Sequence, residues 1–164
     1  MSRQASTLRA ADPASASSGA ATDDAKVPLS FTEIAARIRA ADLPEVDVVY
    51  GVATGGVVPA AVVAFHLGVS FRRLEINYRA PDNSPQRPRP ELLARPEPPP
   101  AGTRVLLVDD VAVSGQTLAL ARSVLAGLTV TSLALKGRAA DIVLFPEVTS
   151  CVLWPWKESQ FLAG

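Results

Sequence analysis

Two adjacent carboxylates, Asp109 and Asp110, are the side chains of this sequence whose type and spacing most clearly indicate chemistry. They stand between an apolar run at residues 105–108 and a small polar segment that ends in Ser-Gly-Gln-Thr at residues 114–117. Burial and mutual repulsion both oppose the ionisation of two neighbouring acids at a strand end. We therefore expect a ligand or a cation to stabilise this pair.

The segment after the acids has the features of a phosphate-binding loop at the start of a helix. Backbone NH groups and the hydroxyls of Ser114 and Thr117 converge where the helix dipole favours an anion. Carboxylates accept hydrogen bonds from a ribose diol, and they also ligate hydrated divalent cations. Together these features predict a phosphorylated sugar as the ligand.

A second loop, Ala53-Thr54-Gly55-Gly56, follows an apolar stretch and precedes an apolar helical segment. Ligands of open parallel sheets bind at the carboxyl ends of the strands, so the two loops can serve one site. Taken alone, the glycine pair is also compatible with a simple tight turn.

The elements that must position these loops alternate between helices and apolar strands. A capping-box spacing at Ser30 and Glu33 opens the first helix. We expect helices over 31–41, 57–67 and 116–126, with Gly127 ending the last, and strands over 46–52, 71–78, 104–108 and 129–135. This alternation predicts an α/β fold with a mainly parallel, twisted sheet covered by helices on both faces.

Two segments differ from this pattern. Residues 1–28 are rich in Ala, Ser, Thr and Asp without periodicity, which predicts a disordered N-terminal tail; their acidic residues argue against a transit peptide. Residues 79–103 hold eight of the fourteen prolines, which predicts a long mobile loop. The remaining chain, 29–164, is expected to form one domain around this loop.

Composition excludes several classes of protein. The 16 basic and 16 acidic residues leave no net charge to attract nucleic acid or an anionic membrane. No apolar run is long enough for a membrane span and no secretory signal is visible, so we expect a cytoplasmic protein. One cysteine, Cys151, and one histidine, His66, make an internal disulfide and a zinc site implausible. We expect Cys151 to be a small core residue and His66 to be structural in its apolar helix. Neither a P-loop nor a dinucleotide-binding glycine motif is present.

The segment DDVAVSGQT at residues 109–117 resembles the phosphoribosyl-pyrophosphate (PRPP) loop of type I phosphoribosyltransferases. That loop has two acids, two apolar residues, a variable residue, Ser or Thr, Gly, any residue and Thr. The sequence YGVATGGVVPA resembles the pyrophosphate loop of the same family, and WPW resembles the ending of xanthine-guanine phosphoribosyltransferase-like enzymes. The resemblance spans about residues 31–158 and implies the type I phosphoribosyltransferase fold, with a small hood and a long mobile loop over the active site.

The resemblance also implies a role for each loop. Asp109 and Asp110 would be catalytic and would hold the ribose hydroxyls, with Asp110 also binding Mg2+. Lys136 would meet the exocyclic oxygen of a 6-oxopurine, although a lysine after a strand is often solvated, and Val152 would line the base pocket. The implied PRPP-binding residues are Asp109, Asp110, Val111, Ala112, Val113, Ser114, Gly115, Gln116 and Thr117. The implied pyrophosphate-binding residues are Ala53, Thr54, Gly55 and Gly56, in a loop that often holds a cis non-proline peptide in the family.

The activity implied is Mg2+-dependent transfer of ribose 5-phosphate from PRPP to a nucleobase, with a purine favoured, release of pyrophosphate and a homodimer as the expected assembly. One position departs from this pattern, because Val113 stands where purine salvage enzymes usually carry an aspartate. A valine cannot transfer a proton. A weak or inactive PRPP- or nucleotide-binding regulator therefore stays open, as does transfer to, or hydrolysis of, a non-purine substrate.

Two further expectations concern the loops and the base pocket. Thr54 stands where related purine enzymes carry a basic residue, for which Arg79 or Arg87 could compensate. Trp154 and Trp156 are expected in the core rather than in the base pocket.

Overall fold

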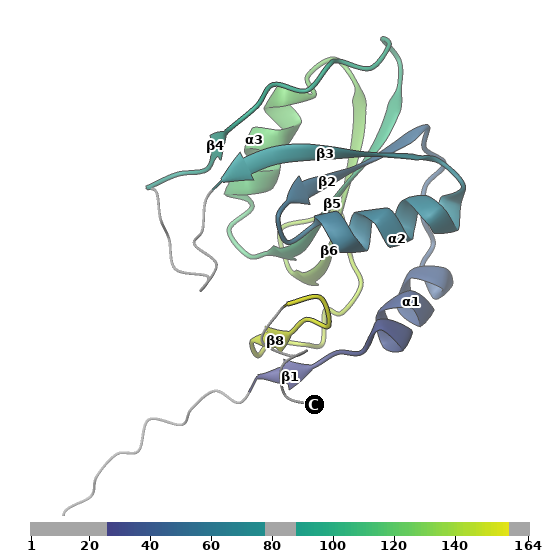
Figure 1. The fold of residues 1–164 in the computed structure, drawn as a ribbon, viewed down its shortest axis with the longest axis vertical. Coiled ribbons are helices and arrows are strands. Elements are labelled where there is room, and N and C mark those ends of the chain that lie inside the picture. Colours follow the sequence, from purple (N-terminus) through teal and green to yellow (C-terminus); the bar gives the residue numbers. More distant parts are fainter. Residues whose placement is uncertain (1–25, 78–87, 158–164) are drawn as a thin grey trace, which may run out of the picture.

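The computed structural model describes residues 26–77 and 88–157, which form a six-stranded sheet with helices on both faces and a small second sheet beside it (Figure 1). Nearly all of the predicted N-terminal tail and the first part of the proline-rich segment lie outside the described residues. Val27 and Pro28, however, form a strand, so the predicted tail extends too far at its end. Within the described residues, no helix is long and apolar enough to cross a membrane.

The main sheet has the strand order β4-β3-β2-β5-β6-β7, in which only β4 runs antiparallel to its neighbour. Its strands are β2 (Val48–Ala53), β3 (Ser70–Asn77), β4 (Glu91–Leu92), β5 (Arg104–Ala112), β6 (Thr129–Gly137) and β7 (Ile142–Val143). The helices are α1 (Phe31–Ala40), α2 (Val57–Leu67) and α3 (Gln116–Val124). The small hood sheet pairs β1 (Val27–Pro28) with β8 (Val152–Leu153) in parallel. These findings confirm the predicted mainly parallel α/β fold.

Alternation along the strands divides the core into two clusters. Val49 and Leu106 belong to the cluster on the face covered by α1 and α2, whereas Val48, Tyr50 and Leu107 belong to the cluster on the face covered by α3. Neighbouring residues of a strand point to opposite faces, so strands buried on both sides are apolar throughout. The buried strands thereby hold the loops at their carboxyl ends on a rigid base.

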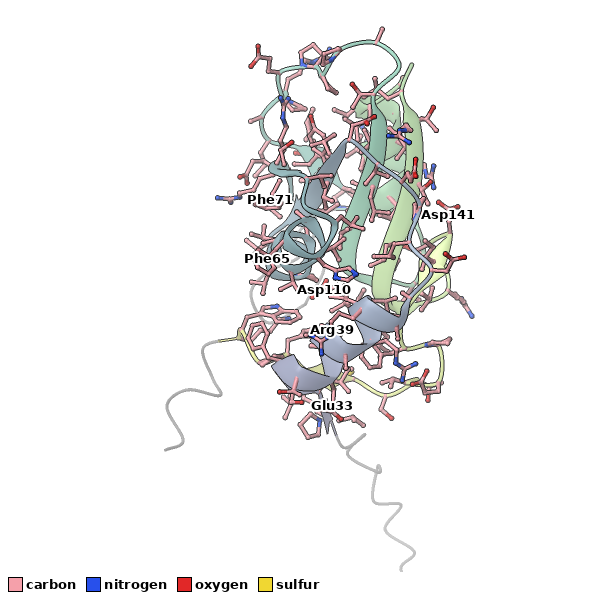
Figure 2. All side chains as sticks on the ribbon, turned by 90° about the vertical axis from the view of Figure 1, so that its right-hand side faces the viewer. Glu33, Arg39, Phe65, Phe71, Asp110 and Asp141 are labelled. Atoms are coloured by element: carbon pink, nitrogen blue, oxygen red, sulfur yellow. The ribbon has the colours of Figure 1, made fainter. Side chains whose placement is uncertain are left out.

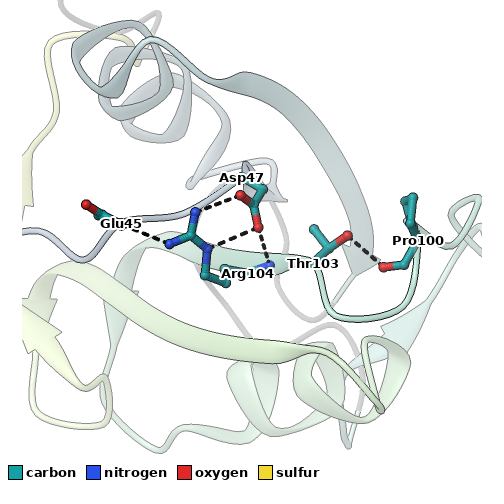
Figure 3. Close-up of polar contacts among 5 residues, drawn as sticks. All are labelled: Glu45, Asp47, Pro100, Thr103 and Arg104. Atoms are coloured by element: carbon teal, nitrogen blue, oxygen red, sulfur yellow. Dashed lines mark hydrogen bonds and ion pairs between the residues drawn. The ribbon is translucent and has the colours of Figure 1, made fainter.

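The amino ends of β2 and β5 are joined by an exposed cluster of charges (Figure 3). Arg104 contacts Asp47 at 2.8 Å and Glu45 at 3.1 Å, and the backbone NH of Arg104 also donates to Asp47 at 2.8 Å. Hydrogen bonds from Arg104 lower the pKa of Asp47 to about 2. This cluster lies at the end of the sheet opposite the two glycine-containing loops, so its role is structural.

The predicted elements form, but several bounds and environments differ. The strand expected over 104–108 continues to Ala112, so both acids lie inside β5 rather than after it. The last predicted helix ends at Val124, before Gly127. Cys151, expected in the core, is exposed, and His66 is also exposed on α2. Trp154 is buried, as predicted.

Candidate functional site

The two loops predicted to bind ligand follow the neighbouring strands β2 and β5, between which the order of strand addition reverses. From β2 the chain passes to β3 on one side, whereas from β5 it passes to β6 on the other. The pairing of β2 with β5 ends at Gly51 and Val108, and beyond it each strand pairs only with its outer neighbour. Such a switch point is where open α/β sheets bind their ligands.

The loop of residues 53–56 contains a cis peptide bond between Ala53 and Thr54, as the family resemblance implies. The NH of Gly56 donates to Val52 O at 2.8 Å, and the NH of Val57 donates to Thr54 O at 3.3 Å. Among the described residues, the NH groups of Thr54 and Gly55 have no protein acceptor. The loop therefore presents two unused donors at the carboxyl end of β2.

This loop packs directly against the acid pair. A Cβ atom added to Gly55 would lie 2.4 Å from Oδ1 of Asp110. A Cβ atom added to Gly56 would lie 2.4 Å from Val108 O and 2.8 Å from Asp109 Cα. Only glycine allows such an approach, and the structure thereby brings together two motifs that lie more than fifty residues apart in the sequence.

The two acids occupy different environments. Asp109 is 7% exposed, and its Oδ1 accepts a hydrogen bond of 2.9 Å from the NH of Asp110. Burial, followed by the charge of Asp110, raises the pKa of Asp109 well above its usual value. Asp110 is half-buried, with its side chain at the end of the sheet (Figure 2). Asp110 is therefore the acid with the more direct access to a ligand, and Asp109 lies beneath it.

The loop after β5 leads into α3 with unused backbone donors. Gly115 has a φ of 75° and occupies the N-cap position of α3, and its carbonyl accepts from the NH of Ala119 at 2.8 Å. Among the described residues, the NH groups of residues 113–118 donate to no protein acceptor. Val113 is 52% exposed and Ser114 is exposed. The arrangement has the donors and the helix dipole that an anion requires.

Lys136 lies in β6 beside the acids, because its register partner in β5 is Val111. Its Nζ donates to Ser150 O, a contact that joins β6 to the segment leading into β8. Ser150 could not be predicted from its residue type, because it contributes its backbone carbonyl to this contact.

Val152 presents main-chain groups near this contact. In the pairing of β1 with β8, Val27 NH donates to Cys151 O at 2.8 Å, and Leu29 NH donates to Leu153 O at 3.3 Å. Because the main-chain groups of neighbouring strand residues point in opposite directions, the NH and carbonyl of Val152 point away from β1. Behind this segment Trp154 stacks on Trp156, with ring centroids 5.2 Å apart.

The acid pair offers carboxylate oxygens to a cation. No group of three or more His, Cys, Asp or Glu side chains that could hold a metal exists in the described part of the chain. A carboxylate that leaves most positions to water and to ligand oxygens suits Mg2+, which is usually held by one or two carboxylates plus substrate phosphates. Asp110 fits that requirement.

Comparison with solved structures shows the same fold in several proteins. A purine phosphoribosyltransferase from Pyrococcus horikoshii is 24% identical with a TM-score of 0.67, over 81% of this chain and 94% of that one. A xanthine-guanine-hypoxanthine phosphoribosyltransferase from Helicobacter pylori is 15% identical with a TM-score of 0.64, over 84% and 97%. A hypothetical protein from Neisseria gonorrhoeae with bound ppGpp is 18% identical with a TM-score of 0.61, over 80% and 90%.

Among curated proteins, no sequence matches the chain. Its family is shown by a sequence profile of the phosphoribosyl transferase domain, which matches residues 26–154 and thus covers both loops, the acid pair and Lys136. The chain belongs to the phosphoribosyl transferase family.

Proposed function

We propose that this protein is a Mg2+-dependent phosphoribosyltransferase that moves ribose 5-phosphate from PRPP to a purine base and releases pyrophosphate. The observation that carries the proposal is the contact between Gly55 and the carboxylate of Asp110. It joins a loop with unused NH donors to an acid pair, and a second loop with unused donors follows the acids. PRPP has a pyrophosphate, a ribose diol and a 5-phosphate, for which these three features are suited.

The acid pair would bind the ribose ring. Asp110 accepts hydrogen bonds from the 2- and 3-hydroxyls and contributes a carboxylate to Mg2+, while buried Asp109 fixes the backbone of Asp110 through its 2.9 Å hydrogen bond. When bound, Mg2+ stabilises the negative charge that develops on departing pyrophosphate. The catalytic role of Asp109 is thereby to position Asp110 and to complete the polar face beneath the sugar.

The two loops would hold the two phosphate-bearing ends of PRPP. The NH groups of Thr54 and Gly55 donate to the pyrophosphate, and donors fixed before the reaction stabilise the leaving-group charge without reorganisation. The NH groups of residues 113–117 and the hydroxyls of Ser114 and Thr117 hold the 5-phosphate at the start of α3. The sugar is thereby fixed on both sides of its reacting carbon.

The base would lie beside Lys136 and Val152. A lysine ammonium has three donors, and the hydrogen bond to Ser150 O leaves two for the exocyclic oxygen of a 6-oxopurine. The NH and carbonyl of Val152, which point away from β1, can meet other polar atoms of the base. These groups favour a purine with an oxygen at position 6.

We also propose that the protein is a cytoplasmic homodimer in which α2 packs against α2 of a second copy. The helix contains no Asp, Glu, Lys or Arg, and Phe65 on its outer side is 90% exposed (Figure 2). A helix surface without charge can pack against itself without like-charge repulsion, and exposed apolar surface favours association.

The proposal is tested by measuring pyrophosphate release from Mg-PRPP with a panel of purines and pyrimidines. Release that depends on hypoxanthine, guanine or xanthine is the expected result. Release with pyrimidines alone would overturn the assignment of the base site, and release without any base would show hydrolysis rather than transfer.

A second candidate function is favoured by Val113. Its 52% exposed side chain stands at the loop position where the family resemblance leads us to expect a proton-transferring acid. A regulator that binds PRPP or a phosphorylated nucleotide needs the phosphate loops but no proton transfer. The ppGpp-bound protein of the same fold fits that function. Binding of PRPP without release of pyrophosphate for any base would favour this regulator.

A further inference from the structure

The connection between β6 and β7 is unusually short for two parallel strands. Leu133 pairs with Ile142, and Ala134 pairs with Val143, so only residues 138–141 separate the end of β6 from the start of β7. Parallel neighbours usually need a crossover of a dozen or more residues. These four residues, here named the return segment, must carry the chain from the carboxyl end of β6 back to the level of Leu133.

The first end of the return segment is fixed to the residues that flank the phosphate loop. Ala112 O accepts hydrogen bonds from the NH groups of Arg138 at 2.8 Å and Ala139 at 3.0 Å. A Cβ atom added to Gly115 would lie 3.1 Å from the Cβ of Ala139. The return segment therefore contacts the residues just before and just after Val113 and Ser114, namely Ala112 and Gly115.

The close approach at this end depends on Gly137. Its φ is 118°, and an added Cβ atom would lie 2.1 Å from Ala112 O. A side chain at position 137 would clash with the carbonyl of Ala112, so only glycine fits there. Ala112 is thus held both by its pairing with Gly137 and by the two hydrogen bonds from the return segment.

The second end of the return segment is held by Asp141. Its carboxylate accepts hydrogen bonds from the NH of Ser132 at 2.7 Å, from the hydroxyl of Ser132 at 2.8 Å, and from the guanidinium of Arg122. The NH of Asp141 donates back to Ser132 Oγ at 3.0 Å, and Arg122 also donates to Val130 O at 2.7 Å. Ser132 is 1% exposed, so this anchor is fixed to the interior of the sheet.

The anchor also joins the return segment to the helix that follows the phosphate loop. Arg122 lies in the last turn of α3, so Asp141 connects α3 to β6 as well as to its own segment. Figure 2 shows Asp141 towards the β6–β7 edge of the sheet and Phe65 of α2 towards the opposite edge. The phosphate loop is thus enclosed by a ring of contacts that runs through α3, Arg122, Asp141 and the return segment.

We propose that Asp141, held by Arg122 and Ser132, is a positioning residue that sets the geometry of the phosphate loop for the 5-phosphate of PRPP. The inference rests on the proposed function, since it requires that residues 113–117 bind phosphate. Asp141 itself touches no ligand. It fixes the return segment, which in turn contacts Ala112 and Gly115. The NH donors of the phosphate loop lie between these two residues, and they must be placed to within tenths of an ångström to bind the 5-phosphate together.

Calorimetric titration with two probes tests the inference. Ribose 5-phosphate reports on the phosphate loop, and Mg-pyrophosphate reports on the loop of residues 53–56, which follows β2 and is separated from β7 by β5 and β6. We expect Asp141→Ala to raise the Kd for ribose 5-phosphate about tenfold, equivalent to roughly 1.4 kcal/mol, and to leave that for Mg-pyrophosphate within about twofold. Asp141→Asn, which keeps an acceptor oxygen for Ser132, should show the same selectivity to a smaller extent and carries the test if Asp141→Ala does not fold.

Glu147→Gln is the matched control. Glu147 forms a similar ion pair with Arg37, and its side chain is 54% exposed against 52% for Asp141. It lies outside the ring of contacts, so both affinities should be unchanged. The inference is overturned if the Asp141 variants bind ribose 5-phosphate as tightly as the wild type, or if they lose both probes equally. Failure of the wild type itself to bind ribose 5-phosphate would instead overturn the proposed function.

Discussion

Replacing Gly55 by alanine should separate the function of the site from the stability of the fold. The added Cβ would lie 2.4 Å from Oδ1 and 2.6 Å from Oδ2 of Asp110, whereas ordinary contact begins at 3.4 Å. The carboxylate must therefore move by about 1 Å. Because these atoms are the free end of a side chain, rotation of Asp110 relieves the clash with little change in stability. A misplacement of about 1 Å can cost roughly 100-fold in activity, and we expect that loss for kcat/KM with PRPP.

Gly56→Ala provides the contrast. Its Cβ would meet Val108 O at 2.4 Å and Asp109 Cα at 2.8 Å, and these backbone atoms belong to the central strand β5. They cannot move without disturbing the sheet. We therefore expect Gly56→Ala to lower the melting temperature clearly, whereas Gly55→Ala should leave it within about 2 °C of the wild type, a shift that corresponds to less than ~1 kcal/mol.

Thermal unfolding, followed by steady-state kinetics and calorimetric PRPP binding on the folded variants, makes the comparison. A double-mutant cycle sharpens it, since Gly55→Ala should have no further effect on PRPP affinity once Asp110 is itself replaced by alanine. Equal additional loss in both backgrounds would refute the argument that Gly55 acts through the Asp110 carboxylate.

Three other predictions follow from single side chains. Lys136→Ala should lower kcat/KM for hypoxanthine and guanine roughly 10- to 100-fold, which is the usual effect of losing a hydrogen bond to a charged group. The value for adenine should be unchanged, because adenine lacks the exocyclic oxygen. Equal losses in steady-state assays with all three bases would show that Lys136 is structural. The pKa of Asp47 is lowered from 3.8 to about 2, so its bond to Arg104 stabilises the fold fully above about pH 4 and is lost as pH falls towards about 2. In acid titrations of unfolding free energy, Asp47→Asn should therefore be less stable than the wild type near pH 7 by an amount that shrinks as the pH falls below about 4 and vanishes only below about pH 2; a difference that stays constant across this range would contradict the pKa assignment. Phe65→Ser should convert a dimer into a monomer in sedimentation velocity, and because dimerisation stabilises the folded state, the melting temperature should fall with it; a wild type that is already monomeric would refute the proposed assembly.

Local sequence signals predicted the elements that carry the site. The helix at residues 57–67 has its predicted bounds because glycines flank it at positions 56 and 68, and Pro59 fits its first turn. The capping box of Ser30 and Glu33 is formed as predicted. The two loops could be identified because phosphate sites depend on residue types and on a strand before and a helix after the loop, both of which are visible locally.

Features that depend on pairing between distant segments could not be predicted. The apolar run predicts a strand that ends at residue 108, before the acids, but pairing with β6 extends β5 to Ala112. The two-residue strands β1 and β8 carry no periodicity, and Cys151, which precedes β8, is exposed rather than in the core. The contact of Gly55 with Asp110 and the anchor at Asp141 likewise arise only when the sheet assembles.

The central claim is that the two loops and the acid pair form one PRPP site. Its most direct test is the affinity for PRPP in the presence of Mg2+. Calorimetry would measure this affinity for the wild type and for the Asp109→Asn/Asp110→Asn double variant. We predict saturable one-to-one binding by the wild type and a loss of at least about 100-fold in the variant, because charged hydrogen bonds to both the sugar and the cation are removed. Equal affinity of the two proteins, or no binding by the wild type, would contradict the account.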